Sequence, residues 1–123
     1  MRPQSAKAKG RKLQQWARDK LIEYFGLSAQ DVRSTSMGSA GEDLLFSPAA
    51  QKMIPFSIEC KNRGAIAVYG WWEQACSQEK VSSDIQPLVI LKQDRSQPLA
   101  LCDADWLFKT MKELHDHRQR QQT

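Results

Sequence analysis

The apolar run LVIL, which covers residues 88–91 and follows Pro87, limits the folds open to this chain more than any other stretch. A short continuous apolar run of this kind is typical of a β-strand that is buried on both faces. Such a strand needs packed elements on each side of its sheet. The run therefore favours an α/β fold with a central mixed β-sheet flanked by helices.

Hydrophobic periodicity predicts the other elements. Apolar residues recur at helical spacing over 11–25, and these are Leu13, Trp16, Ala17, Leu21, Tyr24 and Phe25; Gly26 is placed to end that helix. We expect helices over residues 11–25, 69–80 and 104–115, and one helical turn at Pro48. Period-two or continuous apolar patterns predict strands over 32–34, 43–47, 56–61, 88–91 and 99–102.

The predicted element order is α-β-β-β-α-β-β-α. We expect the first three strands to form a meander, and the fourth to lie beside one of them and parallel to it after a helical crossover. The final helix should begin after Asp103 as its N-cap. Its apolar residues, which should face the core, are Trp106, Leu107, Met111 and Leu114.

The composition is that of one globular domain. The chain has 123 residues, of which 41% are hydrophobic and 26% charged, and no apolar run approaches the ~20 residues that span a bilayer. We expect a basic, flexible N-terminal arm over 1–10, a single domain over 11–116 and a polar C-terminal tail over 117–123. The three cysteines lack C-x-x-C spacing, which indicates reduced thiols in a cytoplasmic protein.

The charge distribution modestly favours a polyanionic partner. The net charge is +4, and Lys7, Lys9, Arg11 and Lys12 crowd the N-terminal end. Basic termini often contact nucleic-acid backbones. Solvated, frayed ends would explain the same charges equally well, so charge alone leaves both interpretations open.

The stretch PFSIECKN, residues 55–62, places an acid and a base on one face of a predicted strand. Glu59 and Lys61 are two residues apart, so their side chains project together. Asp43 begins the preceding strand, and in a hairpin the start of one strand lies beside the end of the next. We therefore expect Asp43 to lie close to Glu59 and Lys61.

Two converging carboxylates repel each other unless a cation lies between them. Carboxylate oxygens are ligands that suit Mg²⁺, with Mn²⁺ as a substitute. A divalent metal lowers the pKa of bound water and neutralises a scissile phosphate, and a neighbouring lysine stabilises the charge of the transition state. Asp43, Glu59 and Lys61 together favour phosphodiester cleavage.

The segments GEDLLFS and PFSIECKN resemble the D…(D/E)-x-K core of the PD-(D/E)XK nuclease superfamily. Within that superfamily the chain is most similar to phage and archaeal Holliday-junction resolvase-like endonucleases, over roughly residues 10–95. The segments that carry the resemblance, in order, are GRKLQQWARDKLIEYFGL, VRSTSMGSAGED, IECKN, WWEQA and PLVILK. The resemblance implies a restriction-endonuclease-like αβββαβ core.

The resemblance also implies the roles of individual residues. Asp43, Glu59 and the backbone carbonyl of Cys60 would be metal ligands, and Lys61 the catalytic lysine. Archaeal resolvases carry a glutamate on the first helix, and alignment of the helix ends puts Gln15 at that place. Glu23 is a second candidate for this role.

Further candidates line the expected active site and the path of DNA. Gln74, on the helix after the catalytic strand, occupies a place where related nucleases often have a catalytic glutamine or lysine. Polar and basic residues near strand ends, turns and the N-terminus would contact DNA, and these are Lys9, Arg11, Lys12, Arg33, Ser36, Asn62, Arg63, Lys92 and Arg95.

The leading hypothesis from the sequence is a Mg²⁺-dependent DNA endonuclease that resolves branched DNA such as Holliday junctions. Because two symmetric cuts need two active sites, we expect a homodimer, without a membrane partner or a small-molecule cofactor. Two alternatives stay open. One is a nuclease of the same superfamily with another DNA target, for nicking, repair or restriction. The other is a non-catalytic DNA-binding protein on the same fold.

Overall fold

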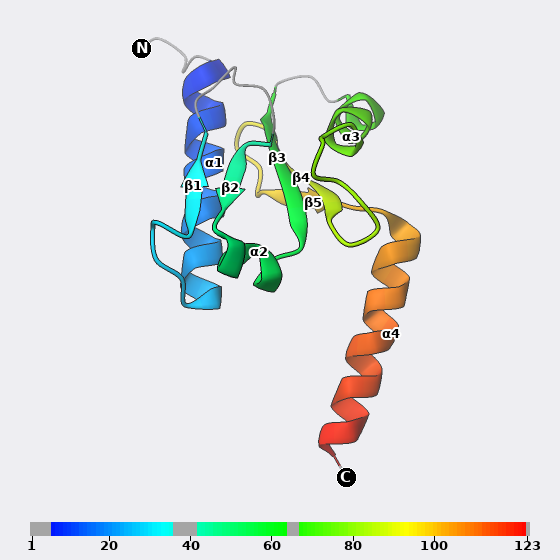
Figure 1. Ribbon diagram of the computed structural model, residues 1–123. Coiled ribbons are helices and arrows are strands. Elements are labelled where there is room, and N and C mark those ends of the chain that lie inside the picture. Colours follow the sequence, from blue (N-terminus) through cyan, green and yellow to red (C-terminus); the bar gives the residue numbers. More distant parts are fainter. Residues whose placement is uncertain (1–5, 36–41, 64–66, 123) are drawn as a thin grey trace.

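The computed structural model describes residues 6–35, 42–63 and 67–122, and its described part has an α/β fold (Figure 1). The elements in chain order are α1 (Ala6–Phe25), β1 (Val32–Ser34), β2 (Leu44–Phe46), α2 (Pro48–Met53), β3 (Phe56–Asn62), α3 (Val68–Cys76), β4 (Gln86–Lys92), β5 (Leu99–Leu101) and α4 (Ala104–Gln121). None of the described helices is both long enough and apolar enough to cross a membrane.

The larger sheet is mixed and has the strand order β3-β4-β5. β3 and β4 run parallel, with Glu59 opposite Val89, and β5 is antiparallel to β4. The connection from β3 to β4 passes through α3, which confirms the predicted crossover between parallel strands. β1 and β2 form a separate antiparallel pair in which Val32 lies opposite Phe46.

The predicted three-strand meander is replaced by two sheets that meet at Asp43. The amide of Asp43 donates to the carbonyl of Ile58 at 2.9 Å, and the amide of Cys60 donates to Asp43 Oδ2 at 2.7 Å. The second bond explains why the ladder stops here, because a side-chain carboxylate takes the strand amide that a backbone carbonyl would otherwise accept. β2 itself is only three residues long.

The two faces of the larger sheet are covered by different helices. On one face Ile58 and Cys60 pack against Leu13 and Ala17 of α1. On the other face Trp71 and Ala75 of α3 pack with Val89, the central residue of the LVIL strand. Since neighbouring residues of β3 project from opposite faces, Glu59 and Lys61 lie on the α3 side and Asn62 on the α1 side.

α1 begins at Ala6, five residues before its predicted start, so residues 6–10 of the predicted arm are helical. Alanine and lysine are strong helix formers, and an ion pair of 2.8 Å between Lys9 and Asp94 ties this first part of the helix to the β4–β5 turn. The end of α1 is as predicted. Gly26 has φ +64°, and the Leu27 amide closes the helix by donating to the carbonyl of Ile22 at 3.0 Å.

α3 ends at Cys76, whereas the periodicity predicted a helix to residue 80. Ser77 accounts for the difference, because its hydroxyl donates to the carbonyl of Gln74 at 2.7 Å and so competes with continuation of the helix. The residues that follow, Gln78 among them, turn back toward the sheet.

α4 leaves the body of the molecule and projects away from it (Figure 1). Asp103 caps it as predicted, accepting from the Trp106 amide at 2.7 Å. Trp106 packs edge-on against Phe56, with ring centroids 5.2 Å apart. The expectation that Leu107, Met111 and Leu114 face the core is wrong, because all three are exposed. The helix runs to Gln121, so most of the predicted tail is helical.

Candidate active site

The fold brings Asp43 and Glu59 together at the boundary of the two sheets. The backbone of Asp43 is held by Ile58, and its carboxylate accepts from the Cys60 amide at 2.7 Å. These two bonds place the carboxylate of Asp43 directly over residues 58–60 of β3. The local sequence explains the arrangement, since the residue before a three-residue strand is free to turn its side chain into the neighbouring strand.

Glu59 is a buried acid. Its side chain is 2% exposed, and Oε1 accepts a hydrogen bond of 2.6 Å from Gln78 Nε2. Burial, followed by the negative charge of Asp43, raises the pKa of Glu59 to about 7, although the ammonium of Lys61 acts in the opposite direction. Near neutral pH, this pair of carboxyl groups is therefore poised to hold either a proton or a cation.

Lys61 and Cys60 have different roles at this position. The ammonium of Lys61 stabilises the ionised form of Glu59, which lies on the same face of β3. The Cys60 side chain packs into the core against α1, where burial raises the pKa of its thiol. Only the backbone of Cys60 therefore belongs to the candidate site.

The first helix presents Gln14, and not Gln15, toward this region. Gln15 is exposed. Gln14 is 1% exposed, and its Oε1 accepts from the hydroxyl of Ser34 at 2.6 Å. The next residue, Thr35, donates from its amide and its hydroxyl to the carbonyl of Asp43 at 2.9 and 3.2 Å.

Gln14 and Gln15 are consecutive residues of α1, so their side chains point in directions about 100° apart around the helix axis. Gln14 follows the buried Leu13 and precedes the buried Ala17 by three residues, so its place on the inner face could have been found from the helical period. Glu23 is exposed and lies 3.9 Å from Lys20, away from the carboxylates.

The amide that reaches Glu59 is that of Gln78, which the sequence interpretation missed. Gln74 is exposed on α3. Gln78 lies four residues further along, beyond the end of the helix, where the chain returns toward β3. A correct assignment of the helix end at Ser77 would have been the signal to look past Gln74.

The donor set of the candidate site consists of oxygen atoms. The described residues contain no group of three or more His, Cys, Asp or Glu side chains that could hold a metal ion. Asp43 and Glu59 supply two carboxylates, and backbone carbonyl oxygens complete such sites for hard cations. Two repelling carboxyl groups beside a strand backbone therefore fit a divalent cation with oxygen ligands, such as Mg²⁺, which retains several waters.

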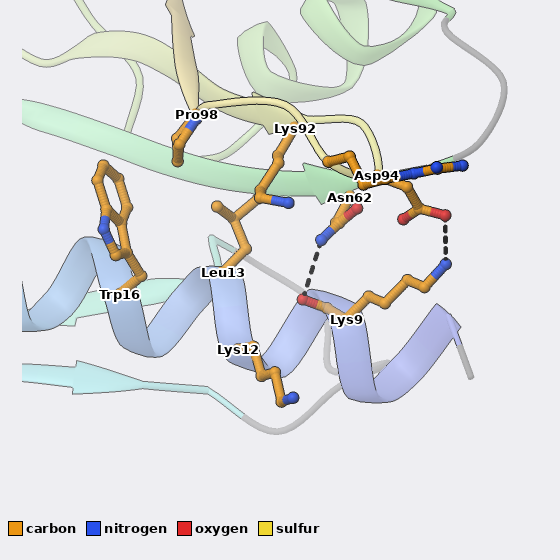
Figure 2. Close-up of a pocket in the computed structure, with 9 residues that line it drawn as sticks. Lys9, Lys12, Leu13, Trp16, Asn62, Lys92, Asp94 and Pro98 are labelled. Carbon is orange, nitrogen blue, oxygen red and sulfur yellow. Dashed lines mark hydrogen bonds and ion pairs between the residues drawn. The ribbon is translucent and has the colours of Figure 1, made fainter. Parts of the chain in front are cut away.

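The predicted DNA-contacting residues divide into two groups. Five of them come together around one pocket of about 660 Å³ (Figure 2), and these are Lys9, Lys12, Asn62, Lys92 and Arg95. Arg11, Arg33 and Arg63 are exposed and do not line it. Ser36 lies outside the described residues.

In comparisons with protein-family models, curated proteins and solved structures, this chain matches none of them. The functional argument consequently depends on the residues themselves and on the geometry that joins them.

Proposed function

We propose that the protein is a Mg²⁺-dependent DNA endonuclease that hydrolyses phosphodiester bonds. The observation that carries the proposal is the meeting of the Asp43 and Glu59 carboxyl groups beside Lys61, with the pKa of Glu59 raised to about 7. A strand interior holds a strained pair of acids at a cost in stability, and such perturbed groups are concentrated at functional sites.

In this proposal Asp43 and Glu59 hold the metal, with the carbonyl of Cys60 as a further ligand. When bound, the metal would lower the pKa of a water molecule and neutralise the scissile phosphate. Gln78 orients Glu59 through its 2.6 Å hydrogen bond, and the Cys60 amide orients Asp43. Lys61 supplies positive charge for the phosphate during cleavage.

The finer fold assignment belongs to the same proposal. If α2 is set aside, the order of the described elements from α1 to β4 is compatible with an αβββαβ core, and β3 lies parallel to β4 with α3 in the connection that joins them. Two features depart from that core: the helix α2 between β2 and β3, and the division into two sheets. The resemblance of GEDLLFS and PFSIECKN to PD-(D/E)XK nucleases supports the assignment at the residues that matter most.

We further propose branched DNA as the substrate and a homodimer as the active form. Support for the dimer comes from α4. Leu107, Met111 and Leu114 are spaced by four and three residues, as in the seam of a coiled coil, and each is at least 39% exposed. We propose that α4 of a second copy of the chain packs on these residues, with the two helices antiparallel.

Charge complementarity favours the antiparallel pairing. Asp103 and Asp105 stand at the start of α4, and Arg118 and Arg120 at its end. Two antiparallel copies would bring the acidic end of each helix beside the basic end of the other. Their helix dipoles would also point in opposite directions, which favours the pairing. A two-fold dimer of this kind would supply two active sites for two cuts.

The proposed cleavage is tested with Asp43→Asn and Lys61→Ala. We expect either change to reduce Mg²⁺-dependent cleavage of a labelled four-way junction by at least about 100-fold, because each removes a group that acts on the phosphate or its metal. Binding to the junction in EDTA should remain within a few-fold of the unaltered protein. Gln15→Ala serves as the matched control, since this exposed glutamine should be dispensable.

The result for linear duplex separates the possible targets. Paired nicks restricted to the junction support a resolvase, whereas equal cutting of duplex DNA supports a nuclease with another target. Unchanged cleavage in both variants would contradict the nuclease assignment.

A non-catalytic DNA-binding protein is the second candidate. The observation that favours it is that only two carboxylates meet at the candidate site within the described part of the chain, and that the side chain which α1 presents toward them is the uncharged Gln14. Tight DNA binding without cleavage under Mg²⁺ or Mn²⁺ would establish this candidate in place of the first.

A further inference from the structure

A second candidate site lies on the opposite face of β3 from the carboxylates. It is the pocket of about 660 Å³ between α1, the end of β3 and the turn that joins β4 to β5. Lys61 and Asn62 are consecutive residues, so the pocket and the carboxylate site share the same end of one strand but open on different sides. In Figure 2, Trp16 and Pro98 lie at one end of the pocket and the Lys9–Asp94 ion pair at the other.

The pocket carries an excess of positive charge. Asp94 is paired with Lys9 at 2.8 Å, and this contact lowers the pKa of Asp94. Lys12, Lys92 and Arg95 also line the pocket, and within the described chain none of them has an acidic group at ion-pair distance. Three cations around one hollow favour a phosphate or another compact anion.

The other end of the pocket is apolar and flat. Leu13 forms part of its floor, and Trp16 is 42% exposed beside Pro98. An exposed indole next to a positively charged groove is the arrangement on which single-stranded nucleic acids stack their bases, and stacking contributes about 1–3 kcal/mol per base. The pocket thus joins an anion-binding part to an aromatic part.

Asn62 adds an unused hydrogen-bond acceptor. Its side chain lines the pocket and is 7% exposed, and Nδ2 donates to the carbonyl of Lys9 at 3.4 Å. Oδ1 is buried and has no hydrogen-bond partner among the described residues, which costs about 1–3 kcal/mol. The neighbouring Lys9–Asp94 ion pair is partly exposed, so its opening would let a donor from a ligand reach Oδ1.

We propose that this pocket binds one unpaired nucleotide of a DNA strand. The base stacks on Trp16, the phosphate is held by Lys12, Lys92 and Arg95, and Asn62 accepts from an N–H group of the base. A nucleotide within a duplex presents its phosphate but not its base, because the base faces are stacked on neighbours and the base edge is paired. The choice of DNA as the source of the nucleotide rests on the proposed function.

The test measures binding of a fluorescein-labelled hexathymidylate and of a labelled linear duplex by anisotropy, in EDTA. Trp16→Ala should weaken binding of the single strand about tenfold, because one stacked base is lost. Lys12→Ala should weaken it about threefold and make the salt dependence shallower by about 0.7 in the log–log slope. Duplex binding should change less than twofold in both variants.

Three controls make the measurement specific to the pocket. Trp16→Phe keeps an aromatic face and should retain most of the binding, which separates stacking from a general loss of structure. Lys20→Ala removes the same charge as Lys12→Ala from α1, but outside the pocket, and should have little effect. Unlabelled thymidine monophosphate carries one base and one phosphate but none of the flanking strand, and it should compete more weakly than the hexathymidylate.

Unchanged binding of the single strand in Trp16→Ala would overturn the proposal, and so would equal losses for single strand and duplex. Competition by thymidine monophosphate as strong as that by the oligonucleotide would assign the pocket to free nucleotides instead. Because EDTA prevents cleavage, these outcomes do not depend on nuclease activity. A failure of the nuclease proposal appears only in the Mg²⁺ cleavage assay with Asp43→Asn and Lys61→Ala.

Discussion

Glu59 is the residue of the candidate site whose ionised form its surroundings disfavour. It is buried, it lies beside a second carboxyl group, and it accepts a short hydrogen bond from Gln78. Burial and the charge of Asp43 both oppose its ionisation, and Lys61 and Gln78 only partly compensate. The residue is therefore adapted to exchange a proton for a cation.

The raised pKa of Glu59 predicts how the unfolding free energy depends on pH in the absence of metal. The pKa of Glu59 is raised from 4.5 to about 7, so the native state holds this proton more tightly than the unfolded chain does. The unfolding free energy should therefore fall as the pH rises from about 4.5 to 7, with a total loss of about 3 kcal/mol. Glu59→Gln should remove this part of the slope, because its amide mimics the protonated carboxyl group.

Urea unfolding in EDTA at pH 5 and pH 8 measures the effect, and Glu113→Gln on the exposed side of α4 is the control. At pH 8, Mg²⁺ should stabilise the unaltered protein but not Glu59→Gln. Parallel pH dependences of the unaltered protein and Glu59→Gln would contradict the prediction.

At the scale of elements, the ends of helices position groups in and around the candidate active site. The end of α3 at Ser77 releases Gln78 toward Glu59. The end of α1 at Gly26 turns the chain toward β1, which carries Ser34 to Gln14. The geometry of the candidate active site thus depends on where these helices end as much as on the directions in which they run.

Two glycines test this dependence with the same chemical change. Gly26 has φ +64°, and nothing would lie within 4 Å of an added Cβ, so Gly26→Ala should cost about 1–2 kcal/mol through its backbone conformation alone. Gly70 lies inside α3 with equally open surroundings, so Gly70→Ala should stabilise the protein by about 0.5–1 kcal/mol. Urea unfolding of both variants gives the two values, and effects of the same sign would refute this explanation.

At the scale of the whole molecule, α4 is the part that a single copy of the chain leaves uncovered. Apart from Trp106, its large apolar side chains are exposed along a helix that projects from the body. Exposed apolar surface of this kind marks an interaction site. A second copy with its α4 antiparallel would cover it, and the charges at the two ends of the helix agree with that pairing.

Leu114→Asp should convert the proposed dimer into a monomer, because it places a charge in the middle of an apolar seam. Sedimentation velocity at about 20 μM would measure the change. Glu113→Gln changes the charge of α4 by the same amount at an exposed position outside the seam, and this variant should remain dimeric. A monomeric unaltered protein at this concentration would exclude pairing through α4.

Some features of this protein were predictable from local pattern alone. The LVIL run is a strand packed on both sides, the bounds of β1 were predicted exactly as found, and Gly26 and Asp103 end and begin their helices as expected. These features depend on side-chain periodicity and on backbone preferences within a few residues. The approach of Asp43 to Glu59 was also predictable, because in two consecutive antiparallel strands the start of the first lies beside the end of the second.

The tertiary structure decided the features that depend on contacts between distant residues. Periodicity places Gln14 on the inner face of α1, but it could not decide between Gln74 and Gln78, since the early end of α3 redirects the chain. The apolar pattern of α4 predicted a buried face but could not say whether this chain or another covers it. The pocket around Asn62 depends on α1, β3 and the β4–β5 turn meeting in space, and residues so far apart in sequence leave no local signal of their proximity.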